Sequence, residues 1–78
     1  MDKVRSVELL MEFFNSIGGI VLLRQYECPK GMIDLIVKHK GRLLFIGISS
    51  EEDVVRKVAK YYMKRYGIQA VDYDVVSL

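Results

Sequence analysis

The chain has 78 residues, of which 51% are hydrophobic, and its formal net charge is +2 at pH 7. This length predicts a single domain over residues 1–78, whose folding buries only roughly 60–65% of the surface of the unfolded chain. A high apolar fraction in so small a core favours self-association. The charge is too low to indicate nucleic-acid binding by itself.

Cysteine and hydropathy set the expected compartment. Cys28 is the only cysteine, which excludes an internal disulfide and fits a reducing, cytoplasmic environment. No apolar run reaches the ~18 residues of a membrane-spanning helix. The sequence passes from Met-Asp-Lys directly into an amphipathic pattern, so we expect no signal peptide and no membrane association.

The first expected element is a helix that Asp2 caps and that runs to about Ile17, where Gly18-Gly19 ends it. Apolar residues recur at helical spacing along one face: Val4, Val7, Leu10, Met11, Phe14 and Ile17. A strand over 20–27 follows, in which the apolar residues 20–23 form a run that we expect to be buried. Arg24 interrupts this run, and residues 27–31 form a loop around proline and glycine.

Two further strands, residues 33–37 and 43–48, are joined by the polar turn 39–42. Both are apolar at both parities, which is typical of strands buried on both faces. Asp34 is the exception, and a carboxylate there needs a partner. Loop N–H groups or Arg24 are the alternatives. If Lys38 and Leu43 pair across the turn, Asp34 lies opposite Gly47.

The rest of the chain predicts a second helix that ends at Gly67 and a last strand over 68–76. Ser49 with Glu52, or Ser50 with Asp53, has the spacing of a capping box at the start of this helix. The order is therefore α-β-β-β-α-β. A hairpin followed by a helical crossover predicts an α/β fold with a central mixed sheet flanked by helices.

This pattern resembles the PD-(D/E)XK nuclease superfamily, and within it the archaeal Holliday-junction resolvases. Glu8 stands about a helix length before the glycine that opens the first strand, and Arg24 closes the apolar run of that strand. Asp34 precedes Gly47 by the interval that separates the family's two strand carboxylates. The resemblance implies a restriction-endonuclease-like core, with Glu8 and Asp34 as the catalytic and metal-binding carboxylates.

Two departures from the family pattern imply a degenerate site. Gly47 replaces the expected metal-binding glutamate, and Ser49 replaces the expected lysine. Glu8 and Asp34 then remain as a weak pair of ligands, so we expect no required cofactor. An active enzyme would be an endodeoxyribonuclease that uses Mg²⁺ or Mn²⁺.

Basic residues are the second candidate site. Five of them fall within ten residues of the second helix, and three more lie around the hairpin turn. The expected ligand is DNA, contacted through its phosphates, and the residues expected to contact it are Arg24, Lys38, Lys40, Arg42, Arg56, Lys57, Lys60, Lys64 and Arg65. A solvated helix face is the alternative interpretation of the same charges.

Three hypotheses follow from the sequence. The first is a nucleic-acid-binding protein on a nuclease fold with little or no cleavage activity. The second is a metal-dependent endonuclease with a rearranged active site. The third is a dimeric protein-interaction module that keeps only the scaffold. A homodimer is expected because resolvase-like enzymes act on two-fold symmetric junctions.

Overall fold

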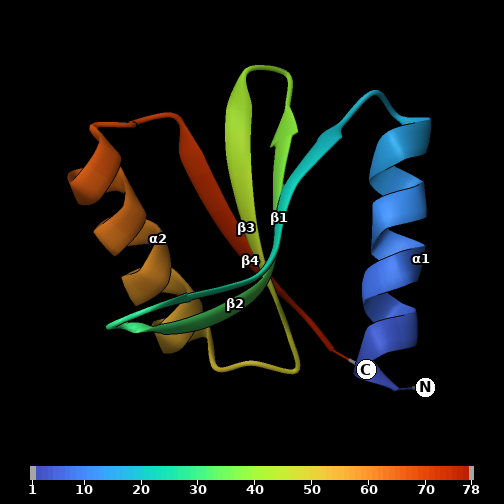
Figure 1. Cartoon of the computed structure of the whole chain (residues 1–78), viewed down its shortest axis with the longest axis horizontal. Helices are drawn as coiled ribbons and strands as arrows, with labels where there is room; N and C mark the ends of the chain where they lie inside the picture. The colour runs from blue at the N-terminus through green and yellow to red at the C-terminus, as the bar shows by residue number, and fades with distance from the viewer. Residues whose placement is uncertain (1, 78) are drawn as a thin grey trace.

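A computed structural model describes residues 2–77 of the chain (Figure 1). The elements, in order, are α1 (Lys3–Ser16), β1 (Ile20–Cys28), β2 (Gly31–His39), β3 (Arg42–Ile48), α2 (Glu52–Tyr66) and β4 (Val71–Val76). This is the order predicted from the sequence. Within residues 2–77, no helix is long and apolar enough to span a membrane.

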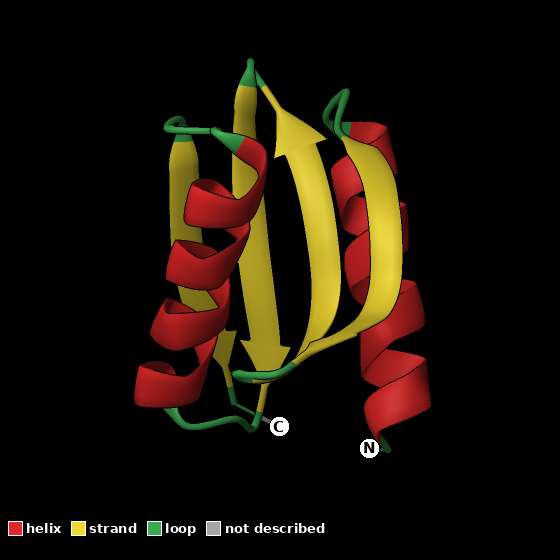
Figure 2. Cartoon of the chain, turned by 60° about the vertical axis from the view of Figure 1, so that its left-hand side comes forward, coloured by secondary structure: helices red, strands yellow, loops and turns green. Residues whose placement is uncertain are grey.

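The four strands form one mixed sheet in the order β1-β2-β3-β4. The first three strands are antiparallel neighbours, and β4 runs parallel to β3. The parallel pair requires a crossover, which α2 provides. The two helices lie on opposite faces of the sheet (Figures 1 and 2). The predicted mixed sheet with flanking helices is therefore confirmed.

The helix ends show one correct prediction and one error. Asp2 caps α1, because its side chain accepts a hydrogen bond from the N–H of Arg5 at 2.8 Å. At α2, by contrast, the N-cap is Glu51, whose side chain makes no capping bond. The predicted capping boxes of Ser49 and Ser50 are therefore wrong. Ser49 instead has a positive φ of 53° at the end of β3, so the helix begins later than expected.

The β2–β3 hairpin has the predicted register and a shorter turn. Lys38 pairs with Leu43, as expected, but His39 also pairs with Arg42. The loop is therefore the two residues Lys40 and Gly41, with φ of 52° and 76°. Positive φ at both positions matches the right-handed twist of the adjoining strands.

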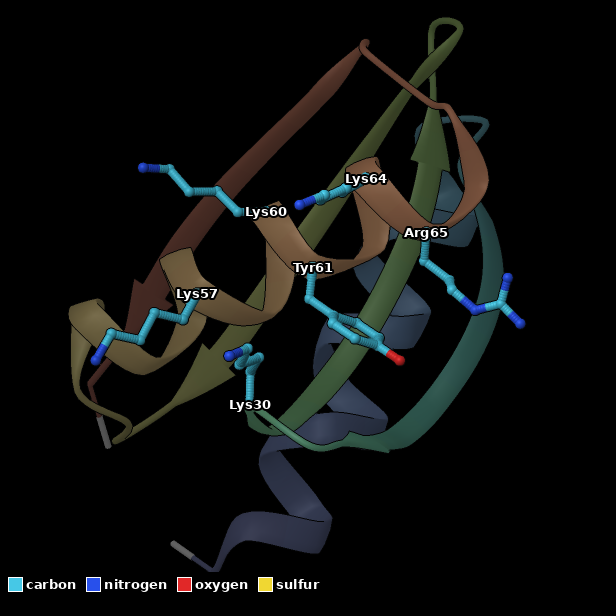
Figure 3. A pocket seen from close by; sticks show the side chains of 6 residues that line it. All are labelled: Lys30, Lys57, Lys60, Tyr61, Lys64 and Arg65. Atoms are coloured by element: carbon cyan, nitrogen blue, oxygen red, sulfur yellow. The ribbon is translucent and has the colours of Figure 1, made fainter.

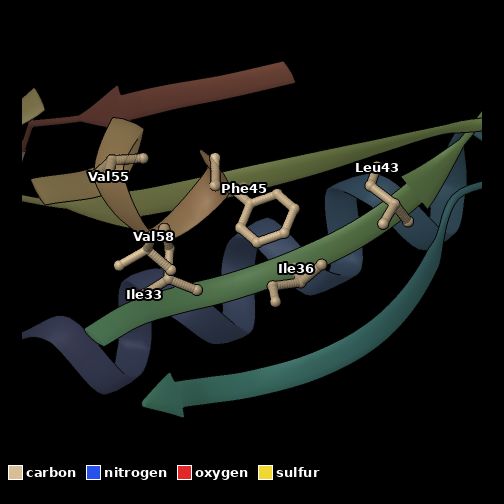
Figure 4. Close-up of a cluster of buried hydrophobic side chains, with 7 residues drawn as sticks. Ile33, Ile36, Leu43, Phe45, Val55 and Val58 are labelled. Carbon is tan, nitrogen blue, oxygen red and sulfur yellow. The ribbon is translucent and has the colours of Figure 1, made fainter. Parts of the chain in front are cut away.

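The core consists of two apolar clusters, one on each face of the sheet. Under α2 lie Ile33, Ile36, Leu43, Phe45, Val55, Val58 and Ala59 (Figure 4). Under α1 lie Val7, Phe14, Leu35, Val37, Ile46 and Ile48. Because β2 and β3 contribute to both clusters, the prediction that these strands are buried on both faces is confirmed.

The first strand does not follow its prediction. Ile20 is 59% exposed, and Leu22 and Leu23 are 43% and 41% exposed, so the run expected to be buried is largely open. The reason is position, since β1 is an edge strand that pairs only with β2. On the neighbouring helix α1, Phe13 and Ile17 are also 54% and 43% exposed. Several large apolar side chains of α1 and β1 are thus exposed.

Candidate functional site

Asp34 is the buried carboxylate of the sheet, with 2% of its surface exposed. Its Oδ2 atom accepts a hydrogen bond from the N–H of Ile48 at 2.7 Å. Its Oδ1 atom lies 3.2 Å from Nζ of Lys3, at the first turn of α1. Asp34 therefore joins three elements: β2, the end of β3, and α1. Neither oxygen lacks a partner.

A small pocket of about 90 Å³ surrounds this ion pair. It brings together three residues that the sequence singles out, namely Glu8, Arg24 and Asp34. Its other lining residues are Lys3, Val4, Val7 and Gln25. We call this set the Asp34 pocket. Arg24 does not pair with Asp34 in it, because its Nη1 atom lies 3.9 Å from Sδ of Met11.

The side chain of Asp34 does not face Gly47, contrary to the expectation from the hairpin. The β2–β3 ladder ends at the pair Leu35–Ile46, one residue before that point. Asp34 lines a pocket with α1, whereas a Cβ atom added to Gly47 would lie 2.5 Å from Cγ2 of Val55 in α2. The two positions therefore face opposite sides of the sheet.

The described residues do not fit the metal site that the fold family implies. Mg²⁺ takes hard oxygen ligands in near-octahedral geometry. Both oxygens of Asp34 are already bonded within the protein. Among residues 2–77, no three His, Cys, Asp or Glu side chains are grouped so that they could hold a metal ion. Asp53, at the start of α2, pairs with Arg56 and Lys57 instead.

The larger hollow of the molecule is basic and lies on the α2 side. It measures about 760 Å³ (Figure 3). Its lining residues, called here the basic hollow, are Lys30, Lys57, Lys60, Tyr61, Lys64 and Arg65. Four of these six were predicted to contact nucleic acid. Lys30 was missed, because it comes from the β1–β2 turn and joins α2 only in the folded chain.

The other predicted cations lie outside the basic hollow, and two of them have acidic partners. Arg42 makes a two-pronged pair with Asp72, with N–O distances of 2.6 and 3.0 Å. Hydrogen bonding to Arg42 lowers the pKa of the Asp72 carboxyl below its usual value. Arg56 pairs with Asp53. The pKa of the Asp53 carboxyl is lowered mainly by its hydrogen bond with Lys57 and, to a smaller extent, by that with Arg56.

The other three cations predicted to contact nucleic acid lie in two further places, away from the basic hollow. Lys38 and Lys40 lie at the β2–β3 hairpin, and neither lines the basic hollow. Arg24 belongs to the Asp34 pocket. The nine predicted cations therefore do not form one continuous surface, and those of α2 form the densest group.

Comparison with known proteins adds a sequence relative and a structural one. No family model matches the chain. A UPF0102 protein from Dictyoglomus thermophilum is 22% identical over 89 residues, a match that covers 91% of this chain and 75% of that protein.

The structural relative is a repair endonuclease from Pyrococcus abyssi, with a TM-score of 0.75 and 15% identity. The match covers 99% of this chain and 38% of that endonuclease, so the chain spans little more than a third of its length. The fold expected from the sequence is thereby confirmed: this chain has the restriction-endonuclease-like α-β-β-β-α-β core.

Proposed function

We propose that the protein binds nucleic acid through the backbone phosphates and cleaves it little or not at all. The basic hollow is the observation that supports this function. Five of its six lining side chains are cationic and none is acidic. Phosphate contacts by Lys and Arg dominate affinity for nucleic acid and need no sequence-specific geometry.

The lack of efficient cleavage is inferred from the Asp34 pocket. In it, Lys3 and the N–H of Ile48 occupy the carboxylate that a metal ion would use. Gly47 faces α2 and offers no ligand. This arrangement supports binding without efficient cleavage.

A binding and cleavage panel tests both parts of this proposal. Labelled four-way junction, duplex, single-stranded DNA and RNA are titrated with protein at several salt concentrations, with and without Mn²⁺. We expect salt-dependent binding and intact substrate. Binding that does not respond to salt, or is absent for every substrate, contradicts the proposal.

An endonuclease with a rearranged site is the second candidate. It is favoured by one observation, because the pocket around Asp34 also contains the carboxylate of Glu8 and the ammonium of Lys3. Metal-dependent cleavage that Asp34→Asn abolishes, in a variant that still binds nucleic acid, would support this candidate over the first.

We also propose that the protein is a homodimer. The support is the exposed apolar surface of α1 and β1, since patches of this kind often mark protein interfaces. Light scattering measures the oligomeric state directly. A dimer that binds no nucleic acid would leave the third hypothesis, a protein-interaction module on this scaffold, as the better account.

A further inference from the structure

We infer that the basic hollow is a site for single-stranded nucleic acid, in which Tyr61 stacks against an unpaired base while the surrounding cations hold the phosphates. This inference rests on the proposed function and specifies its substrate class. It begins from the position of Tyr61, the aromatic residue among the hollow's lining side chains. Figure 3 shows its ring between Lys30 and Arg65.

Four of the cations lie along α2 together with Tyr61. Residues 57, 60, 61, 64 and 65 are spaced three and four apart, so they share one face of the helix. From residue 57 to residue 65 the helix rises about 12 Å. The row is therefore long enough to contact more than one phosphate of a single strand.

Most of these cations have no acidic partner. Lys57 pairs with Asp53 at 3.0 Å. Among the described residues, Lys30, Lys60, Lys64 and Arg65 take part in no ion pair with an acid. The guanidinium of Arg65 lies 5.5 Å from the centre of the Tyr66 ring, which orients it at the edge of the hollow. Positive charge that the protein leaves uncompensated is available for an anionic ligand.

The shape of the site favours an unpaired strand over a duplex. Lys30, on the β1–β2 turn, forms a second wall beside α2, so the surface is hollowed rather than projecting. A recognition helix that enters a duplex groove needs a projecting face. In a duplex, moreover, the bases are stacked on one another and offer no free face to Tyr61. Cationic grooves with aromatic platforms are the usual design of single-strand sites.

The basic hollow is independent of the Asp34 pocket. Asp34 lies with α1 on one side of the sheet, whereas the basic hollow lies along α2 on the other. A strand held by Tyr61 and the lysines therefore does not need Asp34. This separation lets the two sites be varied one at a time.

The first experiment changes the ligand and leaves the protein intact. Fluorescence anisotropy compares a labelled ten-residue oligothymidylate with an abasic strand of the same phosphate number and with a duplex of equal length. We expect the oligothymidylate to bind at least about fivefold more tightly than the abasic strand, the weakest stacking contribution measured for one base. Equal affinity for these two strands would overturn the inference.

The second experiment changes the ring. Tyr61→Ala should weaken oligothymidylate binding by roughly 5- to 150-fold and leave abasic-strand binding unchanged. Tyr61→Phe, which keeps a stacking face, should bind like the parent and serves if the alanine variant fails to fold. Tyr73→Ala is the matched control, because Tyr73 is 40% exposed and does not line the hollow.

The outcomes separate the inference from the proposed function. If Tyr61→Ala weakens the oligothymidylate and not the abasic strand, the inference is supported. The binding can depend on salt and yet be equal for the oligothymidylate and the abasic strand, and equal for Tyr61→Ala and the parent. In that case the proposed function stands and the inference fails. If no strand or duplex binds at all, both fail.

Discussion

The Asp34 pocket and the basic hollow both contain lysine side chains, but the charges are paired in the pocket and mostly unpaired in the hollow. In the pocket, the buried carboxylate of Asp34 accepts a hydrogen bond from a backbone N–H at 2.7 Å and pairs at 3.2 Å with Lys3, whose side chain is 46% exposed. In the hollow, four cations have no acidic partner among the described residues. Burial makes an unpaired polar group or charge costly, so breaking the bonds of Asp34 should destabilise the fold. The hollow is exposed, and its charges remain available for a ligand.

The two sites therefore differ in whether their polar groups are bonded within the protein or are available to a ligand. Both carboxylate oxygens of Asp34 have partners within the protein. Substitutions in the pocket should therefore change stability, whereas substitutions in the hollow should change binding.

The largest expected effect is that of Asp34→Ala. It leaves the Ile48 N–H without an acceptor and removes a packed side chain, so we expect the free energy of unfolding to fall by about 3 kcal/mol. For a domain of this size that lowers Tm by about 12–24 °C. Circular dichroism melting measures the shift. Asp34→Asn, which keeps an acceptor, should lose less, and Lys60→Ala should stay within about 0.5 kcal/mol of the parent. Equal losses for Asp34→Ala and Lys60→Ala would contradict the comparison.

Gly47→Ala should come next, with a loss of about 1–3 kcal/mol from overpacking. A Cβ atom there would lie 2.5 Å from Cγ2 of Val55 and 2.8 Å from Cβ of Ser50. Val55→Ala removes the closer of these atoms, so the double variant should be more stable than the sum of the two single losses predicts. Urea denaturation of all four proteins measures this coupling. Additive losses would mean that Gly47 does not face α2 in solution.

Lys60→Ala and Lys64→Ala should act on binding alone. Each removes one phosphate contact, so each should reduce the slope of log affinity against log salt by about one unit. The loss should be nearly uniform across sequences, because phosphate contacts carry no base information. Anisotropy titrations at four salt concentrations give the slopes. Lys38→Ala, at the hairpin, is the control, and a slope that changes as much for Lys38 as for Lys60 would show that binding is not centred on the hollow.

The smallest effect concerns the exposed pair Arg42–Asp72. The pKa of Asp72 is lowered in the folded protein by its hydrogen bond to Arg42, so the pair stabilises the fold above the unfolded pKa of about 3.9. That contribution is lost as pH falls through the folded pKa. Asp72→Asn should therefore melt slightly below the parent at pH 6, and the two curves should converge toward pH 2. A difference that persists unchanged at low pH would exclude the ion pair as its cause.

Much of the fold could be predicted because its signals are local. The hairpin register followed from the pairing of Lys38 with Leu43, and the burial of β2 on both faces followed from apolar residues at both parities. The same reasoning failed for residues 20–23, because an apolar run looks alike in a central strand and an edge strand. The residues of a strand do not by themselves show whether it has neighbouring strands on one side or on both.

The site was only half predictable, for a related reason. Glu8, Arg24 and Asp34 do line one pocket, but the partner of Asp34 is Lys3, which lies 31 positions earlier and has no local pattern to mark it. Whether Asp34 and Gly47 face the same side of the sheet depends on where the β2–β3 ladder ends. The number of residues between them does not determine that point. Lys30 likewise joins the hollow only through a turn between strands.

The irregular edge of the sheet limits how two copies can meet. The β1–β2 register shifts between Val21 and Leu23, and Gln25 has a positive φ of 52°. Such interruptions bend an edge strand and prevent it from pairing along its length with another chain. We therefore expect that the proposed homodimer does not form by pairing β1 of one copy with β1 of the next. Contact through the exposed apolar side chains of α1, such as Phe13 and Ile17, is the arrangement that this edge leaves open.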